Sequence, residues 1–248
     1  MPRCSTDTLL SPGERKHRVR YLFAVLRAGI AVAILAAIVG QLLTSLAFWR
    51  GAGVQNLSVS VTNFFSFFTV ESNVFSLLAM GYGAWLLVRK RPDPGWYLIA
   101  RASIVTYMVT TGVVYNLLLR GIELPQGSTL AWSNEILHVV APAYLLIDWL
   151  LAPGRRPMPV RTVWIVVIYP IVWAVFTMIR GPFVVDEVLG RNYWYPYPFL
   201  NPNAAPTGYL SVAFYVLLIS VLIAAVGLGV TWVSRRFPWS DVTVREAL

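Results

Sequence analysis

Residues 63–76 read Asn-Phe-Phe-Ser-Phe-Phe-Thr-Val-Glu-Ser-Asn-Val-Phe-Ser, inside an apolar run long enough to cross a bilayer. At helical spacing, hydroxyl and amide side chains fall three or four residues apart: Thr62, Ser66, Thr69, Asn73 and Ser76. Polar groups exposed to lipid go unsatisfied, so this polar stripe has to face protein or water. It predicts either close packing against another helix or the wall of a polar cavity.

The composition excludes an ordinary soluble domain. Of the 248 residues, 57% are hydrophobic and only 12% are charged, which is typical of a multi-span membrane protein. The formal charge of +9 does not indicate a nucleic-acid partner, because the Lys and Arg residues lie in short flanks between apolar runs rather than in one patch. Cys4 is the only cysteine, so no intrachain disulfide and no cysteine metal site can form, and no metal or cofactor is expected.

Six apolar runs predict an all-α integral membrane protein. They cover about residues 21–48, 57–88, 98–119, 130–151, 160–179 and 208–233, each close to or above the ~20 residues that cross a hydrocarbon core. The expected organisation is a basic cytoplasmic tail over 1–18, a six-helix transmembrane domain over 19–236 and a cytoplasmic tail over 237–248. The first run is too long for the apolar part of a signal peptide, so we expect it to remain as the first span.

The basic flanks predict the orientation in the cell membrane. Lys and Arg residues cluster at 15–20, 89–91, 155–161 and 235–236, all on one side of the six spans, whereas the opposite connections carry fewer. Positively charged flanks face the cytoplasm, so both termini are predicted to be cytoplasmic. The long connection 181–207, rich in proline and aromatic residues, is then outside, and its prolines exclude a regular helix.

Charged residues inside the spans are interpreted as structural. Arg27 and Arg101 lie just inside the inner ends of two spans and can snorkel, while Asp148, near the inner end of the fourth span, could pair with either. Glu71 lies roughly 200° around the helix from Thr69, so it is expected to face another helix interface.

His138 forms a second polar cluster, about midway along the fourth span. Asn134 precedes it by four residues and Glu135 by three, so either side chain could hold the imidazole in one tautomer. Counted from the outer ends of their spans at 1.5 Å per residue, Thr69 and His138 both lie roughly 12–18 Å deep. The two side chains can therefore share one cavity.

A hydroxyl beside an imidazole is the minimum apparatus for nucleophilic acyl transfer, because the base removes the proton that makes the hydroxyl a poor nucleophile. Serine fills this role more often than threonine. A lone membrane histidine can also be a helix–helix hydrogen bond, so the pair by itself fits both catalysis and packing.

Three motifs resemble the androgen-induced and androgen-dependent six-pass membrane hydrolases and their predicted bacterial six-pass relatives. They are the Phe-Phe-Thr that ends at Thr69, the sequence Asn134-x-x-x-His138 with Asp148 ten residues later, and the segment Trp-Tyr-Pro-Tyr-Pro-Phe-Leu at 194–200. The animal enzymes hydrolyse fatty acid esters of hydroxy fatty acids with a threonine nucleophile and a histidine. The resemblance implies these roles for Thr69 and His138, a lipid or fatty acyl ester substrate and no cofactor.

Two functions are therefore expected as alternatives. The first is a membrane hydrolase of lipid esters, with orienting or substrate-binding roles for Asn134, Glu135, Asn73 and Arg180. Arg180 ends the fifth span on the outer side, where it is either an interfacial anchor or a bidentate receptor for a substrate carboxylate. The second is a non-enzymatic small transporter or lipid-binding protein with a buried polar cavity, although paired repeats with broken helices are not evident.

Overall fold

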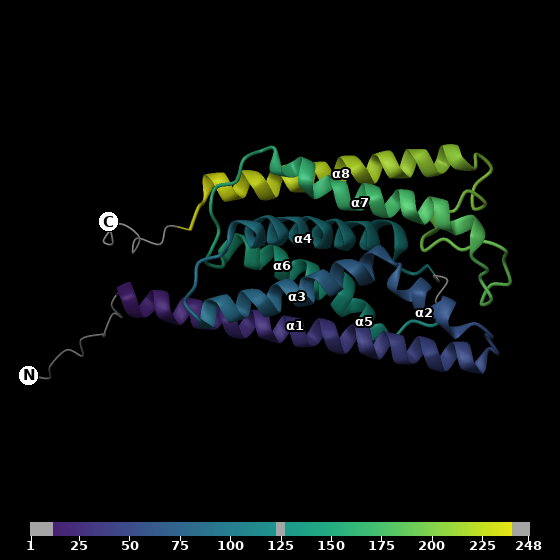
Figure 1. The fold of residues 1–248 in the computed structure, drawn as a ribbon, viewed down its shortest axis with the longest axis horizontal. Coiled ribbons are helices and arrows are strands. Elements are labelled where there is room, and N and C mark those ends of the chain that lie inside the picture. Colours follow the sequence, from purple (N-terminus) through teal and green to yellow (C-terminus); the bar gives the residue numbers. More distant parts are fainter. Residues whose placement is uncertain (1–11, 123–126, 240–248) are drawn as a thin grey trace, which may run out of the picture.

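The computed structural model describes residues 12–122 and 127–239 of the chain. Within these ranges the protein is helical, with no strand beyond one isolated bridge between Asp186 and Arg191. The helices run side by side along the long axis, and the start of α1 and the end of α8 lie at the same end of the bundle (Figure 1).

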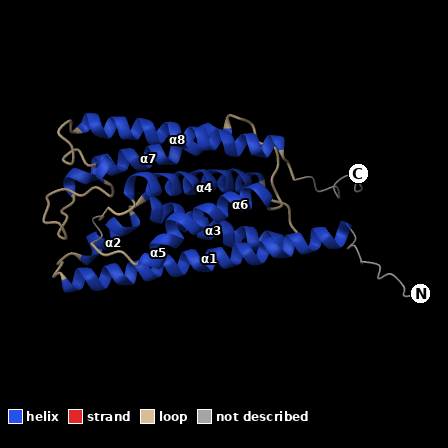
Figure 2. Cartoon of the chain, turned by 180° about the vertical axis from the view of Figure 1, so that it is seen from behind, coloured by secondary structure: helices blue, strands red, loops and turns tan. Residues whose placement is uncertain are grey.

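The main helices are α1 (Pro12–Gly51), α3 (Phe68–Val88), α4 (Gly95–Val114), α6 (Ala141–Leu151), α7 (Thr162–Arg180) and α8 (Tyr209–Arg236), with the short α2 (Leu57–Phe65) and α5 (Ala131–Glu135) near the opposite end. Helix α4 is central, because it packs against α3, α6, α7 and α8, while α1 packs along α3. Seen from behind, α1 and α8 form the two outer edges of the bundle (Figure 2).

Five helical segments are long and apolar enough to cross a membrane, and the bent pair α2–α3 passes the same criteria as a sixth. Large apolar side chains on α7 and α8 are exposed, among them Trp164, Ile168, Leu210 and Leu217. Exposed apolar surface of this extent belongs in lipid, so the structure has the character of a membrane protein.

The predicted second span is not one straight helix. It bends by 66° between α2 and α3, where Phe67 takes an extended backbone conformation. Serine and threonine hydroxyls that bond back to the preceding turn bend helices, and here Thr62 bonds to the Ser58 carbonyl at 2.8 Å and Ser66 to the Thr62 carbonyl at 2.7 Å. The expected continuous polar stripe is therefore wrong: Thr62 is exposed on α2, whereas Thr69, Asn73 and Ser76 are buried on α3.

The connection 181–207 and α7 hold α2 in this bent position. The Glu187 carboxylate accepts from the backbone N–H groups of Gln55 (2.6 Å) and Asn56 (3.2 Å) just before α2. The Trp173 indole donates to the Ser66 carbonyl at the bend, at 3.1 Å. As predicted, this connection contains no α-helix, only the 3₁₀ turns η3 (Gly181–Phe183) and η4 (Pro198–Leu200).

Two predicted spans contain π-helical turns, η1 (Tyr115–Leu119) after α4 and η2 (Ile136–Val140) between α5 and α6. Pro142 accounts for η2, because proline lacks an N–H and its ring clashes with the carbonyl four residues earlier. The Ala141 N–H bonds to the Ile136 carbonyl, which leaves the Leu137 carbonyl free of its usual helical donor. Single π turns are frequent at functional sites.

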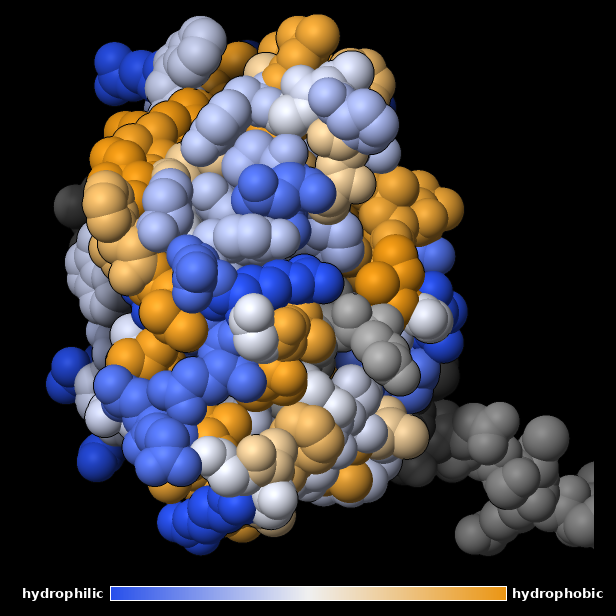
Figure 3. All heavy atoms as spheres, turned by 90° about the vertical axis from the view of Figure 1, so that its right-hand side faces the viewer, coloured by the Kyte–Doolittle hydropathy of each residue, from blue (hydrophilic) through white to orange (hydrophobic). Residues whose placement is uncertain are grey.

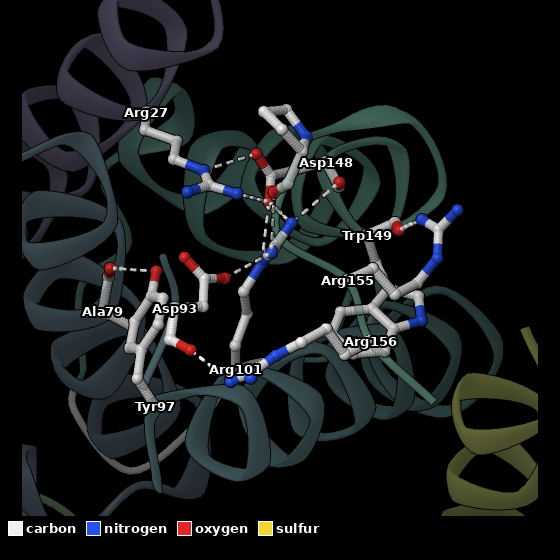
Figure 4. A network of polar contacts seen from close by, with 10 residues as sticks. Arg27, Ala79, Asp93, Tyr97, Arg101, Asp148, Trp149, Arg155 and Arg156 are labelled. Atoms are coloured by element: carbon white, nitrogen blue, oxygen red, sulfur yellow. Dashed lines mark hydrogen bonds and ion pairs between the residues drawn. The ribbon is translucent and has the colours of Figure 1, made fainter. Parts of the chain in front are cut away.

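A buried cluster of charges holds α1, α4 and α6 together (Figure 4). Arg27 binds Asp148 at 2.8 Å, and Arg101 binds both Asp148 (2.8 Å) and Asp93 (3.2 Å). Asp148 was expected to pair with either arginine and pairs with both. Neither arginine snorkels, because both guanidinium groups are fully buried against carboxylates. A Cβ on Gly83 would collide with the Tyr97 hydroxyl beside this cluster, so glycine is needed there.

Part of the predicted amino-terminal tail is helical. Residues 12–18, expected in the basic tail, form the first turns of α1, since proline is tolerated at the first helical position. Residues 1–11 and 240–248 of the two predicted tails lie outside the described residues. Glu71 faces another helix, as expected, because Tyr169 of α7 donates a hydrogen bond to its carboxylate.

Candidate functional site

A small cavity of about 40 Å³ lies where α3, η2 and the connection 181–207 meet. Thr69 and His138 both line it, together with Asn134, Tyr197 and Gln41. The 66° bend and the π turn therefore bring together two side chains that are 69 positions apart in the sequence.

Thr69 lies in the first turn of α3, because the bend makes this helix begin at Phe68. Its N–H is one of the first-turn donors that lack an intrahelical partner. The Tyr197 hydroxyl accepts from this N–H at 3.2 Å and also lies 3.2 Å from Thr69 Oγ1. The Thr69 hydroxyl is thus buried at a helix N-terminus, the positive end of the helix dipole.

His138 is oriented by the backbone rather than by a neighbouring side chain. Its Nδ1 lies 2.9 Å from the Asn134 carbonyl, which can only accept, so Nδ1 carries the proton in the neutral ring. The Tyr115 ring stacks on the imidazole with centroids 4.0 Å apart. This arrangement leaves Nε2 as the nitrogen that can take up a proton.

Asn134 and Glu135 do not hold the imidazole through their side chains. The Asn134 amide donates to the Tyr115 hydroxyl and so fixes the ring that stacks on His138. The Glu135 carboxylate binds the Arg120 guanidinium at 2.9 and 3.1 Å, on the exposed surface. Glu135 is therefore occupied by Arg120, and Asn134 orients His138 through its carbonyl.

Asn73 ties the helix of Thr69 to the segment of His138. Its amide donates to the Thr69 carbonyl at 2.9 Å and to the Leu137 carbonyl at 3.1 Å. The second bond uses the carbonyl that the π turn releases. Asn73 is therefore placed to position the two candidate groups rather than to contact a substrate. No direct hydrogen bond joins the Thr69 and His138 side chains, both of which the structure describes.

Arg180 lies at the end of the bundle formed by α2 and the connection 181–207, away from the small cavity. Figure 3 shows this end, where a band of hydrophilic side chains crosses the middle and apolar side chains lie on both sides of it. The Arg180 guanidinium donates to Asn63 Oδ1 and lies 5.3 Å from the centre of the Trp194 ring. It also lines a surface pocket of about 570 Å³ with Thr62 and Glu187.

Arg180→Ala is expected to distinguish an anchor from a carboxylate receptor. If Arg180 binds a substrate carboxylate, the variant slows hydrolysis of acid-bearing esters at least ~10-fold more than that of the corresponding methyl esters, because a charge-assisted pair is lost only with the former. Turnover of both ester types by wild type and variant measures this. Equal slowing of both would contradict the carboxylate role and leave Arg180 as a contact that holds α2.

A larger apolar chamber adjoins the small cavity. It has a volume of about 150 Å³ and lies between α4, α7 and α8. Thr69 and Tyr197 line both spaces, so they form the wall between them. An apolar group in the chamber would be next to the Thr69 hydroxyl.

Sequence reasoning did not assign roles to Tyr115 and Tyr197. Tyr197 lies in the Tyr-Pro-Tyr-Pro segment, between two prolines that restrict the backbone. This restriction is a sequence signal that could have marked Tyr197 as a fixed side chain. Tyr115 is one aromatic among many in an apolar span, and no sequence pattern distinguishes it.

The described part of the chain contains no group of three or more His, Cys, Asp or Glu side chains that could hold a metal ion. Comparisons with protein-family models, curated proteins and solved structures gave no match to this chain.

Proposed function

We propose that the protein is an integral-membrane hydrolase of lipid esters, with Thr69 as the nucleophile and His138 as the base. The observation that carries this proposal is that both side chains line one small cavity, with Thr69 at a helix N-terminus and His138 held through Nδ1 by the Asn134 carbonyl. The resemblance to the six-pass membrane hydrolases supports the same two roles.

In this mechanism the Thr69 Oγ1 attacks the ester carbonyl carbon while its proton passes to His138 Nε2, directly or through one water. The resulting oxyanion would lie near the N-terminus of α3, where the Tyr197 hydroxyl can donate to it. The protonated imidazole then donates its proton to the leaving alcohol. Water, activated by the neutral imidazole, hydrolyses the acyl-threonine and restores the hydroxyl.

The apolar chamber supports a lipid rather than a polar ester as the substrate. A chain attached to the carbonyl can lie in the chamber while the carbonyl itself is at Thr69, because Thr69 lines both spaces. The bundle exposes large apolar side chains on its outer surface, which suits a substrate that is dissolved in the bilayer.

The proposal is tested by incubating the purified full-length protein with a fatty acyl ester of a hydroxy fatty acid and measuring released acid. Thr69→Ala should remove hydrolysis, whereas Thr231→Ala should retain it, because Thr231 only bonds back to the Gly227 carbonyl of its own helix. Equal turnover by wild type and Thr69→Ala would contradict the mechanism. A sample that carries intact lipid without cleaving it would instead support the lipid-binding alternative.

We further propose that α2 and α3 together form one span, giving six spans with both termini in the cytoplasm. The first residues of α1 and the last of α8 lie at one end of the bundle, which agrees with an even number of crossings (Figure 1). The basic flanks lie predominantly at that end.

Single cysteines should report this topology. In a Cys4→Ser background, Asn192→Cys is expected to react with an impermeant maleimide from outside intact cells, and Arg91→Cys only after the membrane is opened, because these exposed residues lie at opposite ends of the bundle. Labelling is measured by a mass shift on gels. The reverse pattern would show that the orientation is inverted.

A further inference from the structure

The apolar chamber between α4, α7 and α8 contains two hydroxyl groups that the proposed ester hydrolysis does not use. Its lining is almost entirely apolar, with side chains such as Phe68, Val114, Ile171 and Ile223, and none of the described residues that line it is charged. A dry apolar cavity of ~150 Å³ can hold a group the size of benzene, and this chamber has about that volume.

Two threonines in the wall lack the hydrogen bonds that buried hydroxyls normally make. Thr110 and Thr111 both line the chamber and are buried, yet neither Oγ1 has a hydrogen-bond partner within the described part of the chain. Thr106, one turn earlier on α4, shows the usual solution, because its Oγ1 bonds to the Ala102 carbonyl at 2.9 Å. Buried hydroxyls without a partner are costly, and a rotation about χ1 would turn either Oγ1 toward a ligand oxygen in the chamber, so these two threonines are candidates for contact with a ligand.

We propose that this chamber is a binding site for an uncharged amphiphile, one with an apolar body and a single hydroxyl or carbonyl oxygen that Thr110 and Thr111 contact. A pure hydrocarbon would fill the space and leave both hydroxyls unsatisfied. A carboxylate would be buried without any cation to pair with, which is strongly unfavourable. An alcohol or ketone matches both the apolar wall and the two hydroxyls.

This inference goes beyond the proposed function, since binding in the chamber does not require Thr69 to react. A chamber that binds the alcohol in a protein without hydrolase activity would refute only the hydrolase. A hydrolase whose chamber does not prefer the alcohol would refute only the present inference.

The test uses the purified full-length protein in lipid nanodiscs with a photoreactive octanol carrying a diazirine near the chain end. Labelling should be saturable, should map by mass spectrometry to segments of α4, α7 and α8, and should be competed by unlabelled octanol. Octanoate and octane should each require at least ~10-fold higher concentration to compete, equivalent to ~1.4 kcal/mol.

Three variants complete the test. The double variant Thr110→Val/Thr111→Val keeps the shape and removes both hydroxyls, so the labelling midpoint should rise ~10-fold. The matched control Thr106→Val, on the same helix but with a hydroxyl already bonded, should label like wild type. Ala174→Phe should abolish labelling by filling the chamber, and it provides an independent check if the double variant does not fold. Equal competition by octanoate and octanol, or unchanged labelling of the double variant or of Ala174→Phe, would overturn the proposal.

Discussion

Replacing Asp148 with asparagine is expected to destabilise the protein by about 3–5 kcal/mol, because removing one partner of a buried ion pair leaves an uncompensated charge. Asp148 is fully buried and binds both Arg27 and Arg101, so the variant leaves two buried guanidinium groups with Asp93 as their remaining carboxylate. In a protein of this size the loss should lower the midpoint of thermal unfolding by roughly 6–20 °C. The measurement is thermal unfolding of the purified protein in one detergent.

Glu135→Gln is the matched control for this substitution. Like Asp148→Asn, it removes a carboxylate that lies in the segment Ala131–Leu151 and binds an arginine. The Arg120–Glu135 pair, however, is almost half exposed. Exposed pairs contribute little, so this variant should unfold close to the wild-type temperature. Unfolding of Asp148→Asn at the same temperature as Glu135→Gln would contradict the structural role of the buried cluster.

The second large effect concerns Thr69 and His138 as one catalytic unit. His138→Ala should reduce turnover by about 10²–10⁴-fold, the usual contribution of a general base, and Thr69→Ala should reduce it at least as much. If His138 acts only by activating Thr69, the double variant should be at most a few-fold slower than the slower single variant. Turnover of one ester by the four proteins gives the complete cycle.

The matched comparison is a second cycle in which Thr231→Ala replaces His138→Ala. Thr231 lies on α8 and bonds only within its own helix, so its effect should combine additively with that of Thr69→Ala. Losses that add fully in the Thr69 and His138 cycle would show that the two residues act independently, as packing residues do.

The sequence predicted the membrane character of the fold better than its irregularities. The length of each apolar run locates the spans, because the fixed thickness of the bilayer sets the number of residues needed to cross it. The bend before Thr69 contains neither proline nor glycine, and its cause is the back-bonding of Thr62 and Ser66 together with the Trp173 indole that satisfies the Ser66 carbonyl. The indole contact comes from a residue over one hundred positions away, which no local pattern reveals.

For the candidate site, the sequence predicted the depth of the two main residues but not the contacts of their side chains. Depth counting brought Thr69 and His138 to a similar level, because helical rise is uniform. The expected side-chain orientation of His138 failed because a carbonyl four residues earlier already occupies Nδ1, while Glu135 is closer to Arg120 at the surface. The roles of Asn73 and Tyr197 depend on contacts between distant segments, and only the folded chain shows them.

The central claim, that Thr69 is a nucleophile activated by His138, is tested most directly by a covalent probe. The wild-type protein would be treated with a lipid-like fluorophosphonate, and the modified peptide would be located by mass spectrometry. The mechanism predicts an adduct on Thr69, weak labelling of His138→Ala, and none on Thr69→Ala folded to the same extent. An adduct on another residue, or equal labelling of wild type and Thr69→Ala, would contradict it.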